Sequence, residues 1–244
     1  MATPLVNYCE HINPNILHEL HKRHPRAARN ATRIHQSFLA IPETRLLIWI
    51  AQRTPSRITS DHLTILGFLA QILAGIFYAL SRWNRYSLLV VIACLALNWL
   101  GDSLDGTLAR VRNRQRPAYG FYVDHMIDSL GALCLMAGLA LSTYMHPQLA
   151  IALLIAFLLL SIQSYLATYA LGEFHLSFWK FGPTELRLLL AIGNIALLFR
   201  PIVWHARYRL FDVGGAIGLI CMTAMLLFFT AQNTYRLYQR EGLQ

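Results

Sequence analysis

The segment LGDSLDGTLARVRNRQRPAYGFYVDHMIDSLG, residues 100–131, concentrates acidic side chains within a largely apolar chain. It holds one third of the 12 acidic residues of the protein, namely Asp102, Asp105, Asp124 and Asp128. The first pair shares a helix face with Ala109, at positions i, i+3 and i+7, and the second pair shares one with Gly120, at i, i+4 and i+8. Because only a short basic loop separates the two helices, we expect antiparallel neighbours whose acidic faces meet.

These four carboxylates predict a metal site. Ionised carboxylates at membrane depth repel one another and are costly without partners. A hydrogen-bonded network could keep some of them protonated, but hard divalent cations such as Mg²⁺, Mn²⁺ or Ca²⁺ prefer oxygen ligands and satisfy them better. We therefore expect the aspartates to hold two ions, about 4 Å apart, as a clamp for phosphoryl oxygens.

Small and basic residues beside the aspartates indicate room for a phosphate-bearing ligand. Gly106 and Gly120 would let a ligand approach the backbone closely. For these two and for Ala109, the alternative is close packing between helices. Arg110 offers a planar fork that suits phosphate, but it could also be an anchor on the basic side of a membrane, like the arginines that follow it.

The composition predicts an integral membrane protein. Of the 244 residues, 56% are hydrophobic and only 14% are charged, whereas a soluble domain of this size is more polar. Several apolar runs reach the roughly 20 residues that a helix needs to cross a bilayer. We predict an all-α fold with six transmembrane helices, at residues 61–81, 86–108, 118–143, 147–171, 184–203 and 212–235.

Polar and amphipathic segments flank these spans. Residues 1–40 form a polar basic arm, which we expect to be solvated, with a membrane surface as the next option. Residues 41–57, which include IPETRLLIWIAQRTP, predict an amphipathic helix lying in the membrane interface. The six-helix domain then occupies residues 58–236, and a short tail residues 237–244.

The net charge of +9 fits a positive-inside bias and attraction to anionic lipid better than nucleic-acid binding. Six spans place both termini on the side of the aspartates, and the excess of arginine there predicts that this side is cytoplasmic, in a bacterial inner membrane. The four cysteines lack paired spacing, so we expect neither disulfides nor zinc. The N-terminus lacks the apolar core of a cleavable signal peptide.

Two stretches of the sequence resemble a known family. D-x-x-D-G-x-x-A-R, from Asp102 to Arg110, is followed after nine residues by G-x-x-x-D-x-x-x-D, from Gly120 to Asp128. This pattern resembles the signature of the CDP-alcohol phosphotransferase (CDP-alcohol phosphatidyltransferase) family, which usually has eight residues between the halves. ITSDHLTILG, residues 58–67, is similar to the family's I-T-P-N-x-L-T-x-x-G, with Ser-Asp in place of Pro-Asn. The likeness covers roughly residues 40–235.

The resemblance implies a homodimeric enzyme of phospholipid biosynthesis. Such an enzyme transfers a substituted phosphate group from a CDP-linked donor to an acceptor alcohol and releases CMP, with two Mg²⁺ or Mn²⁺ ions per site. Asp102, Asp105 and Asp124 would bind metal, and Asp128 would contact the second metal and serve as base for the acceptor hydroxyl. The residues that would accommodate the cytidine and the phosphates are Gly106, Ala109, Arg110 and Gly120.

Two features resemble the choline and ethanolamine phosphotransferase branch of the family. His125 in DHMID matches that branch's D-H-G-x-D, and FGPTELR, residues 181–187, is similar to its N-G-P-x-E-G. The resemblance implies that His125 and Glu185 assist in deprotonating a diacylglycerol hydroxyl. Met126 and Leu186 depart from the pattern, since each replaces a glycine.

Several roles stay open. The donor could be CDP-diacylglycerol with a small alcohol as acceptor, or a CDP-aminoalcohol with diacylglycerol. His125 could be a structural residue of the interface, and Glu185 an ordinary first-turn acid of a helix that begins near Pro183. Arg187 could bind an anionic acceptor or a lipid phosphate, or only anchor the helix end.

Two other classes of protein remain as alternatives. A divalent-cation transporter also places carboxylates in membrane helices, but near the midplane and on broken or repeated helices. A catalytically inactive member of the family would bind a CDP-lipid without turnover.

Overall fold

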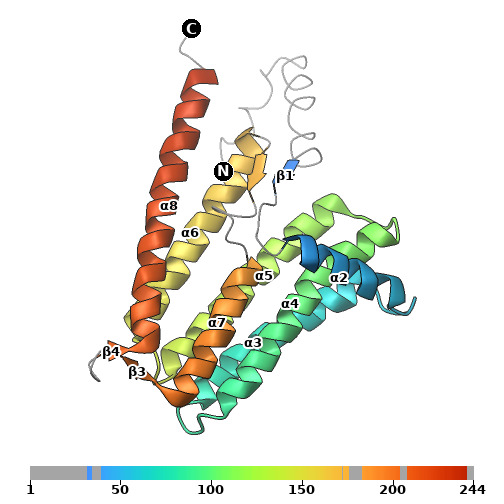
Figure 1. Cartoon of the computed structure of the whole chain (residues 1–244). Helices are drawn as coiled ribbons and strands as arrows, with labels where there is room; N and C mark the ends of the chain where they lie inside the picture. The colour runs from blue at the N-terminus through green and yellow to red at the C-terminus, as the bar shows by residue number, and fades with distance from the viewer. Residues whose placement is uncertain (1–31, 35–39, 172, 176–182, 204–207, 241–244) are drawn as a thin grey trace, which may run out of the picture.

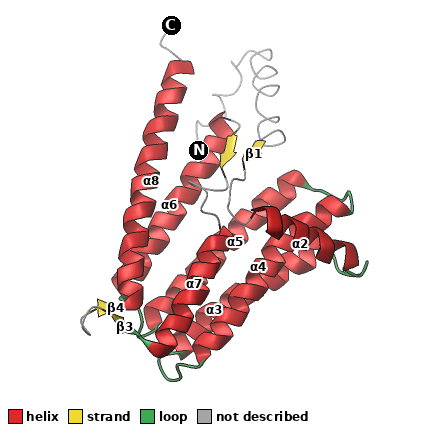
Figure 2. Cartoon of the chain, in the orientation of Figure 1, coloured by secondary structure: helices red, strands yellow, loops and turns green. Residues whose placement is uncertain are grey.

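The computed structural model describes residues 32–34, 40–171, 173–175, 183–203 and 208–240. Figure 2 shows that this part of the chain is almost wholly helical. Its helices are α2 (Ala40–Arg53), α3 (Ser60–Leu80), α4 (Ser87–Val111), α5 (Pro117–Leu141), α6 (Pro147–Leu171), α7 (Pro183–Phe199) and α8 (Leu210–Arg240). Most of the predicted basic arm and residues 241–244 of the predicted tail lie outside the described residues.

Two short strand pairs, which the apolar periodicity does not predict, join parts of the chain outside the long helices. β1 (Thr32–Ile34) pairs in parallel with β2 (Glu173–His175), and β3 (Ile202–Val203) pairs antiparallel with β4 (Tyr208–Arg209). β1 therefore ties part of the N-terminal arm to the segment that follows α6, as Figure 1 shows.

Glycines set the packing of α4 and α5 on α3. A Cβ added at Gly101 of α4 would lie 2.6 Å from the carbonyl oxygen of Leu63, and one added at Gly138 of α5 would lie 1.9 Å from that of Gly75. Backbones approach this closely only where small residues face each other. Gly101 directly precedes Asp102, so its crossing with α3 also fixes the depth of that aspartate.

The expectation that α4 and α5 are direct neighbours is wrong. Each packs extensively on α3, whereas they make at most marginal contact with each other. The glycine crossings on α3 explain this arrangement, because they hold both helices on the same partner. The acidic faces of α4 and α5 are therefore separated by a gap, and α3 forms one wall of this gap.

Defined helix ends fix the loop between the two acidic faces. α4 ends in a turn in which Asn113 takes a φ of 53°, a left-handed conformation that asparagine tolerates. Arg114 N donates to Ala109 O over 2.9 Å and Asn113 N donates to Arg110 O over 3.1 Å, which satisfies two terminal carbonyls of the helix. α5 then begins at Pro117, whose fixed φ suits a first helical position.

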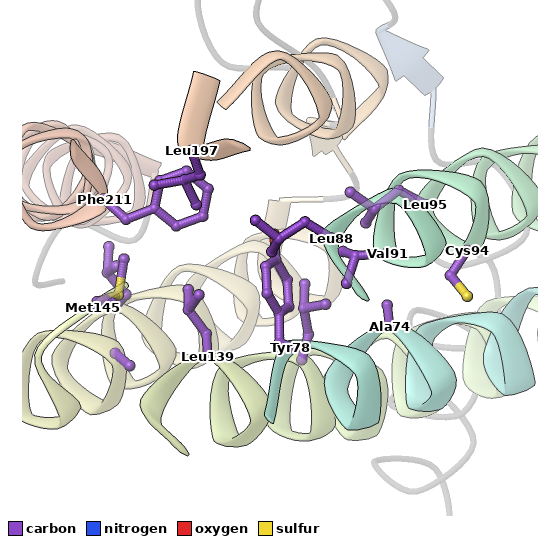
Figure 3. Close-up of a cluster of buried hydrophobic side chains, with 13 residues drawn as sticks. Ala74, Tyr78, Leu88, Val91, Cys94, Leu95, Leu139, Met145, Leu197 and Phe211 are labelled. Carbon is purple, nitrogen blue, oxygen red and sulfur yellow. The ribbon is translucent and has the colours of Figure 1, made fainter. Parts of the chain in front are cut away.

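The main apolar core lies at the end of the bundle away from the aspartates. Figure 3 shows Tyr78, Leu88, Leu139, Leu197 and Phe211 meeting there from five helices. Asn194 Nδ2 of α7 donates to Tyr78 Oη of α3 over 2.8 Å, with both side chains buried. α7 therefore runs from this core to the end that carries the aspartates, which we call the aspartate end.

Five of the predicted spans are confirmed as helices long and apolar enough to cross a membrane: α3, α4, α5, α6 and α8. The remaining prediction, residues 184–203, corresponds to α7, which has 17 residues and ends at Phe199. Pro201 explains the earlier end, since a residue before proline disfavours helical backbone. Of the predicted 41–57 helix, residues 41–53 are helical as part of α2, whereas residues 54–57 form the turn that leads to α3.

Candidate active site

Asp102 of α4 is paired with Arg187 of α7. Arg187 Nη2 donates to Asp102 Oδ2 over 2.6 Å, and Arg187 Nε donates to Asn98 Oδ1 over 2.8 Å. The pair is shielded from solvent, with 16% of the arginine side chain and 34% of the aspartate side chain exposed. Asn98 and Asp102 are four residues apart on one helix face, so a single planar guanidinium reaches both.

Asn98 continues this network to α3. Its side chain is buried, and Nδ2 donates to Gly67 O over 3.0 Å and to Gln71 Oε1 over 3.3 Å. Sequence reasoning missed both Asn98 and Gln71. An amide side chain inside each of two apolar spans was the signal that could have identified them, because polar groups at that depth need partners.

Asp105 is the least solvent-exposed of the four aspartates, with 7% of the residue exposed. Thr64 Oγ1 of α3 donates to Asp105 Oδ2 over 2.6 Å. The backbone N–H of Gly106 donates to the other carboxylate oxygen. Thr64 was not among the predicted site residues, although it lies in the ITSDHLTILG stretch, and it holds the Asp105 carboxylate in place.

Asp124 and Asp128, both half-buried on α5, complete the acidic group. Asp128 lies within electrostatic range of the other three aspartates and of Arg187. Asp105 is likewise within range of Asp102 and Asp124. The structure therefore brings the four aspartates into one region, with α4 on one side and α5 on the other.

A pocket of about 400 Å³, including its open side, lies between α3, α4 and α5 at the aspartate end. It is lined by Ser60, Asp61, Thr64, Asp105, Gly106, Ala109, Arg114, Arg116, Tyr119, Gly120, Val123 and Asp124. Two predicted metal ligands and all three predicted small residues are thus in one pocket. No Cβ added at Gly120 would meet another atom within 4 Å, so this glycine leaves open space rather than permitting helix contact.

The rim of this pocket carries charged and aromatic side chains that sequence reasoning did not assign to it. Arg116 forms an ion pair with Asp61, and its guanidinium lies 4.1 Å from the centre of the Tyr119 ring. The hydrogen bond to Asp61 raises the pKa of Arg116 further, so this residue stays cationic. Arg114 is a second cation in the lining.

Other arginines of the loop have different surroundings. Arg110 is exposed and donates from Nη2 to Thr107 Oγ1 over 2.9 Å, and it is not among the residues that line the pocket. Arg112 Nη2 donates to Thr54 O over 2.8 Å and to Pro55 O over 2.9 Å, so it braces the linker between α2 and α3.

His125 packs in an aromatic group between α5 and α6. Its ring stacks on Phe121 with centroids 4.2 Å apart and lies 4.7 Å from the ring of Tyr165. Glu185 is half-buried in the first turn of α7. Neither of these two predicted proton-transfer residues is among the residues that line the pocket.

The donor chemistry of the aspartates fits hard divalent cations, because four carboxylates supply only oxygen ligands. Among the described residues, no three His, Cys, Asp or Glu side chains are drawn together tightly enough to hold a metal ion. Asp102 is turned to Arg187 and Asp105 to Thr64. The aspartates therefore have the ligand chemistry that a divalent cation requires. To bind one, Asp102 would have to share its carboxylate between the metal and Arg187 or lose the hydrogen bond from Arg187.

Comparison with known proteins gives one family. The family model described as CDP-alcohol phosphatidyltransferase matches residues 57–231. The match begins after α2, includes the whole pocket lining, and ends within α8. A search of curated proteins finds no match to this chain.

Proposed function

Because this chain belongs to the CDP-alcohol phosphatidyltransferase family, we propose that it transfers a substituted phosphate group from a CDP-linked donor to an acceptor alcohol and releases CMP. The observation that carries this proposal is the composition of the pocket. Asp105 and Asp124 share its lining with Gly106, Ala109 and Gly120, which leave room beside the carboxylates. A multi-pass membrane protein with such a site fits the synthesis of phospholipids.

The donor occupies the pocket between α3, α4 and α5. Its cytidine and phosphates lie along the small residues, where the backbone is accessible. Arg114 and Arg116 at the rim, with Arg110 nearby, attract the pyrophosphate, since guanidinium groups suit phosphate oxygens. The apolar part of a lipid substrate extends toward the exposed apolar faces of the helices.

The four aspartates would hold two divalent cations, Mg²⁺ or Mn²⁺. Asp102, Asp105, Asp124 and Asp128 are the ligands, and bound cations would neutralise phosphate charge and polarise the bond to the leaving CMP. Asp128 accepts the proton of the acceptor hydroxyl. The hydroxyl oxygen then bonds to the phosphorus distal to cytidine, while the phosphoanhydride bond breaks and CMP leaves with its electron pair.

His125, Glu185 and Arg187 form the acceptor side of the site. His125 neighbours Asp124 in sequence, and Arg187 reaches Asp102 from α7, so both lie at the edge of the aspartate group. Arg187 is a cation that an anionic acceptor or lipid phosphate could bind. Glu185, in the first turn of α7, assists in taking the acceptor proton.

Six helices cross the membrane, namely α7 together with α3, α4, α5, α6 and α8. Its 17 residues span roughly 26 Å at 1.5 Å per residue, which is at the short end for a bilayer. It runs beside the part of α4 from Leu88 to Asp102, because Arg187 contacts Asp102 near one end and Leu197 belongs to the same apolar cluster as Leu88 near the other. The aspartate end faces the cytoplasm, α2 lies in the interface, and the protein works as a homodimer.

The experiment that tests this function separates the two donor polarities. Purified protein in liposomes receives labelled CDP-diacylglycerol with a pool of small polar alcohols, or labelled CDP-choline and CDP-ethanolamine with diacylglycerol. Labelled phospholipid from one arm would establish the transfer and the donor class. No labelled lipid from either arm, with protein that still binds cytidine nucleotide, would contradict turnover and support a binding-only protein.

A further inference from the structure

Glu43, in the first turn of α2, gathers three hydrogen-bond donors on one carboxylate oxygen. Its Oε1 accepts from Trp99 Nε1 over 2.8 Å and from Ser103 Oγ over 3.3 Å, both on α4. The same oxygen accepts from Thr184 Oγ1 of α7 over 2.9 Å. Three helices therefore meet at one acidic side chain, and the contact with Thr184 joins residues 141 positions apart.

Two of these donors adjoin the network around Arg187. Ser103 directly follows Asp102, and Thr184 lies three residues before Arg187, about one helical turn. The first turn of α7 is thus tied to α4 at two points. One is the Glu43 carboxylate, which bridges Thr184 to α4, and the other is the bond from Arg187 to Asp102.

α2 is itself held firmly against the bundle, so it can fix the position of Glu43. Leu47 and Ala51 are buried, with 6% and 2% exposed, in an apolar cluster with residues of α3 and α4. Trp49 on another face of α2 is 53% exposed. The family match begins at residue 57, so Glu43 lies outside the region that carries the family's signature.

We propose that Glu43 is a positioning residue for the site. It holds the first turn of α7 against α4 and thereby keeps the Arg187 guanidinium on Asp102. α2 then helps to position the residues of the site and is not only a membrane anchor. The consequence for turnover rests on the proposed function, whereas the placement of α7 does not.

Four variants isolate this contact. Glu43→Ala leaves the three donors without their acceptor, and Thr184→Val removes only the α7 donor while keeping a branched side chain of similar shape. Thr184→Ser retains a hydroxyl and should restore wild-type behaviour. Gln52→Ala changes an exposed residue of the same α2 helix and serves as the control.

Hydrogen–deuterium exchange on the full-length protein in detergent tests the placement without any need for activity. We expect the amides of residues 187–190 to exchange about tenfold faster or more in Glu43→Ala and Thr184→Val, since a hydrogen bond to a charged group is lost. Thr184→Ser and Gln52→Ala should match the wild type. Unchanged exchange in both of the first two variants, each folded and monodisperse, would overturn the proposal.

A double-mutant cycle tests the link to Arg187. Glu43→Ala alone should lower turnover by between about tenfold and a hundredfold, as expected for a misplaced group. In an Arg187→Ala background the same change should cost little, because the residue through which Glu43 acts is already gone. If Glu43→Ala lowers turnover by the same factor in the wild-type and Arg187→Ala backgrounds, the proposal is contradicted. If the wild-type protein makes no product but the exchange results are as expected, the proposed function is refuted and the positioning role of Glu43 stands.

Discussion

Arg187 of α7 donates a 2.6 Å hydrogen bond to the carboxylate of Asp102 on α4, 85 residues earlier in the chain. A cation of the chain itself therefore neutralises the first aspartate of the signature. In the proposed enzyme a bound divalent cation would share this carboxylate with Arg187 or compete for it. α7 thereby contributes to the candidate active site, although the motif lies wholly on α4 and α5.

The geometry of this ion pair predicts different outcomes for two substitutions of Arg187. Arg187→Ala should lower the free energy of unfolding by about 1–3 kcal/mol, because the half-buried Asp102 and the buried Asn98 lose their donor. Arg187→Lys keeps the charge but lacks the planar guanidinium that reaches both Asp102 and Asn98. Its loss in the free energy of unfolding should therefore be smaller than that of Arg187→Ala. Thermal unfolding in detergent gives the comparison, with Arg200→Ala, an exposed residue just beyond the same helix, as control. Equal losses for Lys and Ala would contradict the role of the fork.

The close crossing of α3 and α4 predicts a large effect from a single methyl group. In Gly101→Ala the new Cβ would meet backbone atoms of α3 at 2.6–2.7 Å, and backbone cannot rotate away as a side chain can. We expect a loss of about 1–3 kcal/mol in stability, with reduced turnover because Asp102 is displaced. Gly214→Ala in α8, where a Cβ meets nothing within 4 Å, is the matched control and should be neutral or stabilising. An unfolding temperature for Gly101→Ala equal to that of the control would be inconsistent with this packing.

The ion pair at the pocket rim predicts an effect on donor binding rather than on stability. Arg116 and Asp61 are both well exposed, with 51% and 43% of their side chains accessible, and exposed ion pairs contribute little to the stability of a fold. Arg116→Ala should therefore unfold like the wild type but raise the KM for the CDP-linked donor by about tenfold, as for a lost charge-assisted hydrogen bond. Arg82→Ala, on the loop at the opposite end, controls for net charge. An unchanged donor KM would remove Arg116 from the donor site.

The assignment of Asp128 as base predicts that binding and turnover separate. Asp128→Asn keeps the size of the side chain but cannot accept the hydroxyl proton, so we expect turnover to fall below detection. Binding of cytidine nucleotide should remain within a few-fold of wild type, because Asp128 does not line the pocket. Isothermal titration with CDP, alongside the CMP assay, makes the comparison. Full activity in this variant would exclude the base role.

The helices and the acidic faces could be predicted because both depend on local patterns. Apolar runs of span length and the i, i+3 and i, i+4 spacings are visible within one segment, so α3 to α6 and α8 end within a few residues of their predicted limits except at Arg240. The prediction for α7 extended to residue 203 because hydropathy does not register the helix stop that Pro201 imposes.

The contacts around the aspartates could not be predicted in the same way. Thr64 lies 41 residues from Asp105, and Thr184 lies 141 residues from Glu43, so no local spacing joins them. Direct packing of α4 on α5 was the natural expectation for two helices joined by a short loop. The glycine contacts with α3 override it, and the resulting gap between the acidic faces is where the pocket lies.

The proposed function requires that the aspartates of α4 and α5 support metal-dependent release of CMP. The most direct test is CMP release by the purified protein after chelation, and again after addition of Mg²⁺ or Mn²⁺, with CDP-diacylglycerol and small alcohols or with CDP-aminoalcohols and diacylglycerol. We predict no CMP after chelation and recovery on adding metal with one donor class. CMP release that persists unchanged in chelator, or no CMP release with any donor and either metal, would contradict a metal-dependent transferase.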